Sequence, residues 1–310
     1  MLLYYITDRR QFPGDARDQR ARLLDKIAEA ARCGVDFIQL REKDLSAREL
    51  ELLAREAVQV VRENSLPNPH ASQNRANVSH PEIENSHPSA QTRGARAGHP
   101  ESGDRVTRLL INSRTDIALA CGADGVHLTS TDISAADARA VWSMALAFPV
   151  SRSPFSVNTA NAEIVDRESV STENEKSPPF PLPLASLGVG VRMGHPGNWI
   201  IAVSCHTPAE VRMAEAQGAD FAVFAPVFGK TTFPQTPGVG LAALRAACSG
   251  AAAAKNVEGV PAGRMPVLAL GGITLENARA CVDAGAAGIA AVRLFQESDI
   301  ALVVERLRRE

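Results

Sequence analysis

Aromatic residues and surplus charge are both scarce in this chain of 310 residues. Phe, Trp and Tyr make up 5% of the sequence, and Lys and Arg nearly balance Asp and Glu, for a formal net charge of -2. Proteins that bind nucleic acid usually carry a basic surface or aromatic platforms on which bases stack. The composition therefore predicts no nucleic-acid partner. Any anionic ligand must be held by a few well-placed cations.

Long apolar runs and paired cysteines are missing as well. No apolar stretch approaches the ~18 residues of a transmembrane helix, and the opening residues MLLYYITDRR meet Asp8 too early for a signal peptide. The five cysteines form no CxxC motif, which is typical of a reduced cytosolic chain. We therefore expect a cytoplasmic protein with no membrane partner. The sequence leaves open whether it forms a homo-oligomer.

The stretch 64–104 contains hardly any large apolar residues, and the stretch 149–197 is rich in Ser, Pro, Asn and Glu. Neither shows helical or strand periodicity. Neither can bury enough apolar surface to offset the entropy of ordering it. Four of the seven histidines lie in the first stretch, but no pair has helical spacing and no cysteine joins them, which disfavours a metal site. We predict a single domain over 1–310 that carries two flexible, disordered insertions.

Eight short apolar runs remain when these stretches are set aside. They cover 2–7, 36–40, 108–112, 125–128, 199–204, 221–227, 266–270 and 288–292. Runs of this length without polar alternation are typical of parallel strands that are buried on both faces. Amphipathic patterns lie between them, and capping boxes at Ser46 and Thr207 predict helices over 47–61 and 208–216.

A repeated segment supports this alternation. A helix end, a glycine and a turn into a strand recur at 33–38, 121–126, 217–222 and 284–289. Eight such units predict the α/β class and a (β/α)8 TIM barrel, and an open doubly wound sheet is the alternative. In a barrel both insertions would lie in helix-to-strand loops, on the face opposite the chemistry.

Polar residues follow the second apolar run. Gln39, Arg41 and Lys43 alternate along the chain, so we expect their side chains to point the same way. A guanidinium fork and an ammonium group suit a pyrophosphate. The alternative is that Arg41 and Lys43 pair with Glu42 and Asp44 at the surface.

The next three strand ends offer an amide, a carboxylate and a hydroxyl. Asn112 and Asp132 could together hold Mg²⁺ that is also bound by phosphate oxygens, although Asp132 could equally cap the following helix. Ser204 can donate a hydrogen bond, and Cys205 beside it favours a buried packing role over a nucleophilic one. His127 is compatible with either the barrel interior or the site.

Glycines follow the seventh run. Gly271 and Gly272 would let the backbone approach an anion, and we expect a helix to begin directly after them. Phosphate sites after strands seven and eight recur in barrels. Val292 and Arg293 end the eighth run on the same side.

The whole pattern resembles the thiamine phosphate synthase/TenI family. The matching segments are YYITD (4–8), QLREKD (39–44), LLINSRTDIALACGADGVHL (109–128), VSCHTPAEVRMAEAQGADFAVFAPVF (203–228) and PVLALGGITLENARACVDAGAAGIAAV (266–292). The resemblance implies a barrel enzyme, a transferase that uses Mg²⁺. It would join a pyrimidine pyrophosphate to a thiazole phosphate and release pyrophosphate.

The resemblance also implies roles for individual residues. The pyrimidine pyrophosphate would contact Gln39, Arg41, Lys43, Asn112 and Ser204, of which Arg41, Lys43 and Ser204 would be catalytic. The thiazole phosphate would contact Gly272, Val292, Arg293 and the loop residues Lys230 and Thr232. Asp132 would be one of two magnesium-binding aspartates, and Ser113 stands at the degenerate second position.

The chain departs from the family pattern at several of these positions. Ser113 replaces a carboxylate, which weakens the attraction to Mg²⁺. Phe233 stands where the synthases have lysine, and Lys230 lies three places earlier. Arg293 replaces a serine. TenI-like thiazole tautomerases also lack the second carboxylate, but their catalytic histidine corresponds here to Pro226. A tautomerase, or a phosphate-ligand-binding barrel without catalysis, is therefore the alternative function.

Overall fold

Eight parallel strands close into a barrel in the computed structural model, which describes residues 1–65, 106–147, 199–229, 237–249 and 265–309. The strands are β1 (Leu2–Ile6), β2 (Phe37–Leu40), β3 (Arg108–Asn112), β4 (Gly125–Leu128), β5 (Ile200–Cys205), β6 (Phe221–Phe224), β7 (Val267–Leu270) and β8 (Gly288–Ala291). Each pairs with the next in sequence order, and β8 pairs with β1. The predicted TIM barrel is confirmed, and the open doubly wound sheet is wrong.

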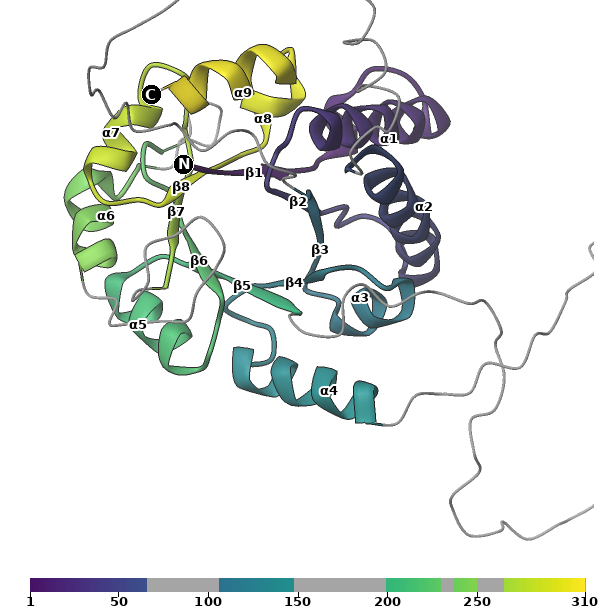
Figure 1. The fold of residues 1–310 in the computed structure, drawn as a ribbon, viewed down its shortest axis with the longest axis horizontal. Coiled ribbons are helices and arrows are strands. Elements are labelled where there is room, and N and C mark those ends of the chain that lie inside the picture. Colours follow the sequence, from purple (N-terminus) through teal and green to yellow (C-terminus); the bar gives the residue numbers. More distant parts are fainter. Residues whose placement is uncertain (66–105, 148–198, 230–236, 250–264, 310) are drawn as a thin grey trace, which may run out of the picture.

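The helices form a ring outside the strands (Figure 1). They are the 3-10 helix η1 (Arg9–Gln11) and α1 (Ala16–Arg32), α2 (Ala47–Ser65), α3 (Thr115–Cys121), α4 (Ala135–Ala147), α5 (Pro208–Ala216), α6 (Gly240–Ser249), α7 (Ala278–Asp283), α8 (Arg293–Gln296) and α9 (Ile300–Arg309). The capping box at α2 is confirmed, because the Ser46 N–H donates to Glu49 Oε2 at 2.9 Å and the Glu49 N–H donates to Ser46 Oγ at 3.4 Å.

One strand ends earlier than expected. The sixth apolar run reaches 227, but β6 stops at Phe224. Pro226 has no N–H to donate to a neighbouring strand, which favours the end of the strand before it. The residues after it form the start of a loop instead.

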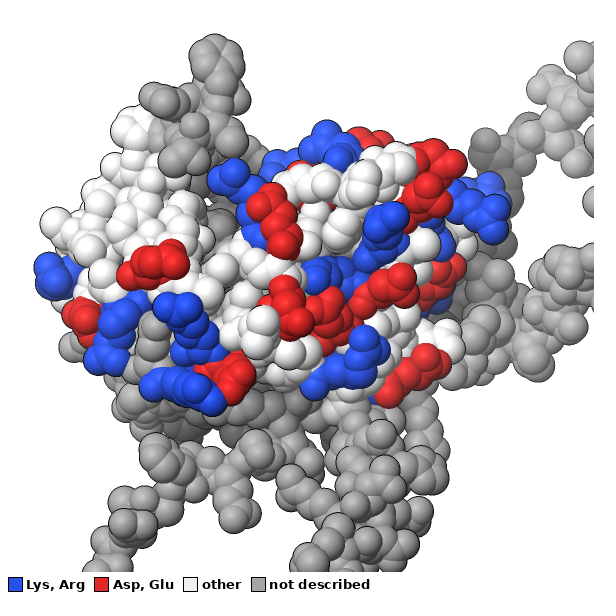
Figure 2. Space-filling view, turned by 90° about the horizontal axis from the view of Figure 1, so that it is seen from above, with Lys and Arg blue, Asp and Glu red and all other residues white. Residues whose placement is uncertain are grey.

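The two predicted insertions fall in helix-to-strand connections. Residues 66–105 lie between α2 and β3, and residues 148–198 lie between α4 and β5. Their predicted flexibility concerns residues outside those that the structure describes. No helix in the described ranges is long and apolar enough to cross a membrane. On the side of the molecule seen in Figure 2, acidic and basic residues are intermixed and neither sign dominates.

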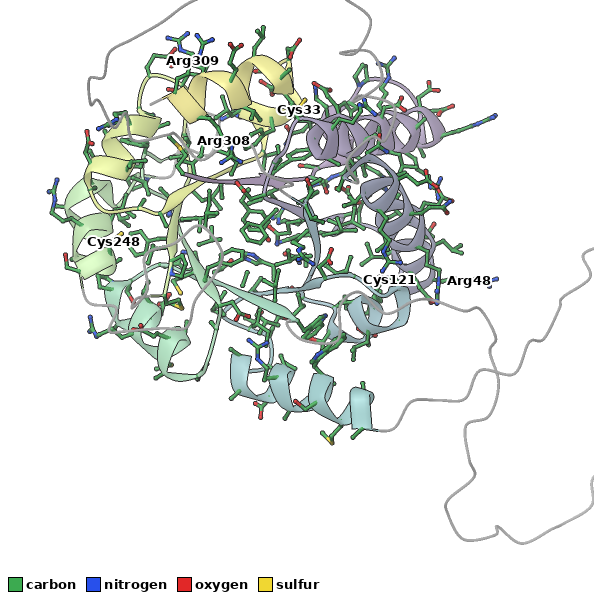
Figure 3. All side chains as sticks on the ribbon, in the orientation of Figure 1. Cys33, Arg48, Cys121, Cys248, Arg308 and Arg309 are labelled. Atoms are coloured by element: carbon green, nitrogen blue, oxygen red, sulfur yellow. The ribbon has the colours of Figure 1, made fainter. Side chains whose placement is uncertain are left out.

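The apolar side chains form two cores. The larger core lies between the strands and the helices, and a smaller one fills the barrel interior around Tyr4, Phe37 and Phe221. The Tyr4 ring meets both phenylalanines edge-on, with ring centroids 5.9 Å and 5.5 Å away. Side chains therefore fill the centre of the ring (Figure 3). The barrel is a packed core, and a ligand must bind at one of its ends.

A pair of tryptophans stacks on the outside of the barrel. Trp142 of α4 and Trp199, just before β5, lie with ring centroids 4.8 Å apart and planes 1° from parallel. Both rings are buried. The stack holds α4 against the start of the next strand.

Candidate functional site

A chain of amides joins the carboxyl ends of β2 and β3. Gln39 Nε2 donates to Asn112 Oδ1 at 2.8 Å, and Asn112 Nδ2 donates to Ser113 Oγ at 3.0 Å. These two hydrogen bonds fix the orientation of both side-chain amides. Gln39 Oε1 is buried, and it accepts no hydrogen bond within the described part of the protein. A buried amide oxygen without a donor is an acceptor that a ligand can satisfy.

Ser113 has a left-handed backbone. Its φ is +60°, and among the described residues it is the one non-glycine residue with positive φ. Its N–H donates to the His127 carbonyl at 2.8 Å, which holds the turn after β3 against β4. Asn and Asp adopt this conformation more readily than Ser. The turn therefore stores strain at the predicted metal position.

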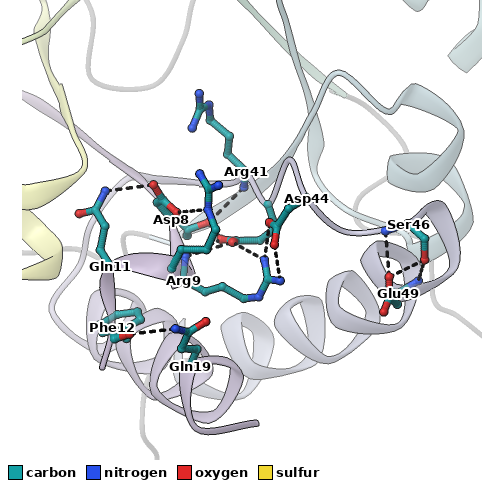
Figure 4. A network of polar contacts seen from close by, with 12 residues as sticks. Asp8, Arg9, Gln11, Phe12, Gln19, Arg41, Asp44, Ser46 and Glu49 are labelled. Carbon is teal, nitrogen blue, oxygen red and sulfur yellow. Dashed lines mark hydrogen bonds and ion pairs between the residues drawn. The ribbon is translucent and has the colours of Figure 1, made fainter. Parts of the chain in front are cut away.

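Arg9, at the start of the 3-10 helix η1 that follows β1, holds the acidic residues that follow β2 (Figure 4). Its guanidinium lies 3.2 Å from Glu42 Oε2 and makes a bidentate pair with Asp44 at 2.7 and 2.8 Å. Glu42 is 4% exposed and also accepts from Thr7 Oγ1 at 2.6 Å. Burial raises the pKa of Glu42, although the hydrogen bonds from Thr7 and Arg9 oppose that shift.

Arg41 takes no part in this network through its side chain. Its backbone N–H donates to Thr7 Oγ1 at 3.0 Å, while the guanidinium extends away from Arg9 and Asp44 (Figure 4). It makes no hydrogen bond or ion pair with any residue in the described ranges. The expected alternative, pairing of Arg41 with Glu42 and Asp44, is therefore wrong. Those carboxylates pair with Arg9, and the Arg41 guanidinium is available to a ligand.

Sequence reasoning missed Arg9. The signal was available, because Arg9 lies a few residues after the first strand and Arg41 directly after the second. The rule that barrel sites collect at the carboxyl ends of strands applies to every strand. Arg9 serves the site indirectly, by holding the acids beside Arg41.

A cavity of about 310 Å³ opens beside the ends of β2 and β3. Its lining residues are Leu40, Glu42, Lys43, Leu45, Leu50, Asn112, Ser113 and Arg114. Lys43, Asn112 and Ser113 thus line one hollow, whereas Gln39 and Arg41 are not among its lining residues. Its size lies at the lower end of small-molecule pockets.

His127 links the barrel interior to the site. Its Nδ1 lies 3.0 Å from the Tyr4 hydroxyl, and its Nε2 lies 2.7 Å from Ser204 Oγ. Burial, with a smaller contribution from the charge of Arg41, lowers the pKa of His127 to about 3. The imidazole is therefore neutral at neutral pH. The sequence left His127 unassigned, and the structure places it between the two.

Asp132 forms a turn after β4. Its Oδ2 accepts from the Thr129 N–H at 2.6 Å and from Thr129 Oγ1 at 2.8 Å. Helix α4 begins after Ser134, whose Oγ accepts from the Asp137 N–H at 3.1 Å. The alternative that Asp132 caps this helix is therefore wrong, because Ser134 does so.

The donor set fits Mg²⁺ that is shared with a substrate. The Oδ1 atom of Asp132 accepts no hydrogen bond in the described part of the chain. Those residues hold no cluster of three or more His, Cys, Asp or Glu side chains suited to a metal. Mg²⁺ commonly uses one or two carboxylates, water and substrate phosphates. Asp132 with the Ser113 hydroxyl is compatible with that pattern.

Cys205 is buried beside Ser204, and the packing role predicted for it is supported. Its side chain is 1% exposed, and burial raises the pKa of its thiol to about 12. The thiol therefore stays protonated at neutral pH and is a poor nucleophile.

The β7 end of the barrel is shaped by backbone. Gly271 and Gly272 have φ of +102° and +66°. A Cβ on Gly272 would lie 2.7 Å from the Gly229 carbonyl oxygen, so the glycine lets this turn pass close to the loop after β6. The expectation of a helix directly after the glycines is wrong. Helix α7 starts only at Ala278, and Asn277 Oδ1 accepts from the Thr274 N–H at 2.9 Å.

The remaining predicted residues divide into two groups. Val292 is half-buried against the interior core, and Arg293 is exposed at the start of α8. Both lie at the carboxyl end of β8, as predicted. Lys230 and Thr232, with Phe233, fall outside the residues that the structure describes.

Fold and site together define a (β/α)8 barrel with a polar site at the carboxyl ends of its strands. The family model described as thiamine monophosphate synthase matches residues 86–166 and 190–295, which is more than half of the chain. The chain belongs to this family, and the resemblance found in the sequence is confirmed. The matched residues include Asn112, Ser113 and Asp132 but begin after Gln39 and Arg41.

Relatives that span nearly the whole chain cover those earlier residues too. A protein of Geobacter sulfurreducens is 30% identical over 94% of this chain and 84% of its own length. The thiamine-phosphate synthase of Syntrophomonas wolfei is 26% identical over 99% and 94%. The solved thiamine phosphate pyrophosphorylase from Pyrococcus furiosus is 21% identical, covers 99% of this chain and 94% of its own, and superposes with a TM-score of 0.55. At that identity it supports the fold alone.

Proposed function

We propose that this protein is a thiamine-phosphate synthase, a transferase that couples hydroxymethylpyrimidine pyrophosphate to thiazole phosphate. The observation that carries the proposal is the Arg41 guanidinium, which has no hydrogen-bond or ion-pair partner among the described residues and follows Gln39 of the Gln39–Asn112 pair. Asp132 follows β4, two strands after the strand that precedes Arg41. A cation beside two amides suits a substrate whose anionic leaving group is attached to a heterocycle. Membership in the family supports it.

The proposed reaction depends more on stabilising the negative charge of the leaving pyrophosphate than on transferring a proton. The bond between the pyrimidine methylene carbon and the pyrophosphate oxygen breaks, and the leaving pyrophosphate takes the electron pair. The thiazole nitrogen then forms the new bond to that carbon. Arg41 and Lys43 stabilise the negative charge that develops on the pyrophosphate. Asp132 and the Ser113 hydroxyl would hold Mg²⁺, which supplies further positive charge when it is bound.

Other groups orient the two substrates. Gln39 Oε1 would accept a hydrogen bond from an N–H of the pyrimidine, and Ser204 would make a second contact with it. The phosphate of the thiazole would lie against the Gly272 turn and the backbone around Val292, with Arg293, Lys230 and Thr232 nearby. Holding both reactants in one orientation supplies much of the rate enhancement in reactions of this kind.

The test is a coupled assay with purified protein, both substrates and Mg²⁺. We expect thiamine phosphate and pyrophosphate as products, and a loss of roughly 10²–10³ in kcat/KM for Arg41→Ala. Arg48→Ala is the control, because that arginine extends outward from α2 (Figure 3) and should leave the rate unchanged. The absence of product with wild-type protein would refute the proposal.

A thiazole tautomerase is the second candidate, and one contact favours it. His206 Nδ1 donates to the Ala225 carbonyl at 2.7 Å, which brings an imidazole next to Pro226. That is the position where the resemblance places the tautomerase histidine. Turnover of the thiazole tautomer alone, lost in His206→Asn, would identify this activity. If thiazole phosphate binds and neither reaction occurs, the protein is a ligand-binding barrel.

A further inference from the structure

Among the described residues, the Tyr4 hydroxyl has a single hydrogen-bond partner. The side chain is fully buried among aromatic rings, and within the described ranges its hydroxyl contacts His127 Nδ1 alone, at 3.0 Å. Burial raises the pKa of Tyr4 well above its usual value, so the phenol keeps its hydrogen. That hydrogen needs an acceptor, because an unmade hydrogen bond in an apolar interior is costly.

The need for an acceptor of the phenol hydrogen decides which group donates in the hydrogen bond between Tyr4 and His127. If Nδ1 carried the imidazole hydrogen, Tyr4 would accept it, and the phenol hydrogen would face apolar rings. If Tyr4 donates instead, Nδ1 must be unprotonated. Because the buried imidazole is neutral, its one hydrogen then lies on Nε2.

The second hydrogen bond follows from the first. The Nε2–H group donates to Ser204 Oγ at 2.7 Å and occupies a lone pair of that oxygen. Ser204 is half-buried at the end of β5. Its own hydrogen has no acceptor among the described residues. The O–H group is therefore available to a molecule bound at the barrel mouth.

We propose that Tyr4 and His127 are positioning residues that make Ser204 a hydrogen-bond donor to an acceptor atom of the pyrimidine substrate. The site would then select a ligand with a lone pair at that point, such as a ring nitrogen, over one with an N–H. The expected effect on catalysis rests on the function proposed above. The assignment of the His127 tautomer is independent of that function.

The tautomer is measured by NMR on ¹⁵N-labelled full-length protein. Two-bond ¹H–¹⁵N correlations distinguish a protonated from an unprotonated ring nitrogen. We expect the Nε2–H form for His127, with its signals assigned by their loss in His127→Gln. Should that variant fail to fold, the shift of the signals in Ser204→Ala assigns them. Finding the Nδ1–H form in the wild-type protein overturns the proposal.

The neighbouring tyrosine provides a matched control. Tyr5 is equally buried, but its hydroxyl donates to Gln296 Oε1 at 3.1 Å on the other side of the strand. Tyr4→Phe removes the donor to Nδ1 and should convert His127 to a mixture of tautomers. Tyr5→Phe should leave the pure Nε2–H form. Equal spectra for the two variants would contradict the assignment.

Kinetics test the consequence for the substrate. Tyr4→Phe should raise the KM for the pyrimidine pyrophosphate about three- to tenfold, with the KM for thiazole phosphate unchanged. Ser204→Ala should do the same, and the double variant should add little, because both changes act on one hydrogen bond. Additive effects, or an unchanged KM in Tyr4→Phe, overturn the proposal. If the wild-type protein forms no product, the proposed function fails and the NMR result alone decides the tautomer.

Discussion

The two halves of the barrel mouth are held in place differently, one by contacts between side chains and the other by the course of the backbone. From β1 to β5, side chains hold one another through hydrogen bonds and ion pairs, as in the contacts of Arg9 with Glu42 and of His127 with Ser204. At β7, the chain relies on glycine backbone that passes close to a neighbouring loop. The shape of the first half depends on the side chains that are present. The shape of the second half depends on the absence of a side chain at Gly272.

This difference suits the two proposed substrates. A pyrophosphate that leaves with negative charge needs cations in fixed positions, and these depend on neighbours such as Arg9. A phosphate that only anchors its substrate can be met by backbone N–H groups. The two halves should therefore respond to different kinds of mutation.

The largest effect is expected for the β1–β2 network. Arg9→Ala leaves the buried Glu42 carboxylate without its cation, which should lower the free energy of unfolding by about 3–5 kcal/mol. Chemical denaturation measures the change. Adding Glu42→Gln should restore part of the loss, because the uncompensated charge is removed. A loss below about 1 kcal/mol in the single variant would show that the network contributes little.

The glycine half should respond to a single methyl group. Gly272→Ala combines positive φ with a Cβ 2.7 Å from a backbone oxygen, and we expect about 2 kcal/mol of destabilisation. The KM for thiazole phosphate should rise while that for the pyrimidine substrate stays constant. Gly34→Ala is the control, since Gly34 has φ of +74° and nothing within 4 Å of its added Cβ. It should lose stability but keep both KM values.

The buried imidazole predicts how stability depends on pH. The pKa of His127 falls from 6.5 to about 3 on folding, so below pH 6.5 the unfolded chain binds a proton that the folded protein does not. Stability is full above that pH and is lost as pH falls towards 3. Between pH 6.5 and 5.5 the loss should be about 1 kcal/mol. Denaturation curves of His127→Gln should lack this component, and an identical pH slope in both proteins would rule it out.

The smallest effect concerns the strained turn at Ser113. Ser113→Asp and Ser113→Asn should both raise stability by about 0.5 kcal/mol, because both residues tolerate positive φ. Only the aspartate should also tighten Mg²⁺, by about fivefold in the half-saturating concentration for the proposed activity. Equal Mg²⁺ dependence in the two variants would show that this position does not face the metal.

Much of the fold could be predicted because buried parallel strands leave a plain pattern. All eight strands lie where the apolar runs predicted them, and the Gln39–Asn112 contact follows from their position at adjacent strand ends. What could not be predicted is which of two adjacent tyrosines faces inward. Tyr4 and Tyr5 lie in a strand buried on both faces, so no polar alternation marks the inner one, and a shift of one residue exchanges them.

The local errors have a similar origin. Asp132 and Ser134 are both good helix caps, and only the backbone path shows that Ser134 is used. The glycines after β7 were expected to let the backbone approach an anion, which stays a prediction. In the structure the turn at Gly272 passes close to the protein's own loop at Gly229, a contact that the sequence does not reveal.

The tryptophan stack gives the protein an intrinsic optical probe. Trp142 and Trp199 are the only two tryptophans of the chain, and their parallel rings are close enough for their excited states to couple. Detachment of α4 from β5 would separate them and remove the resulting circular-dichroism couplet. The docking of this one helix can therefore be followed without any label, separately from the rest of the barrel.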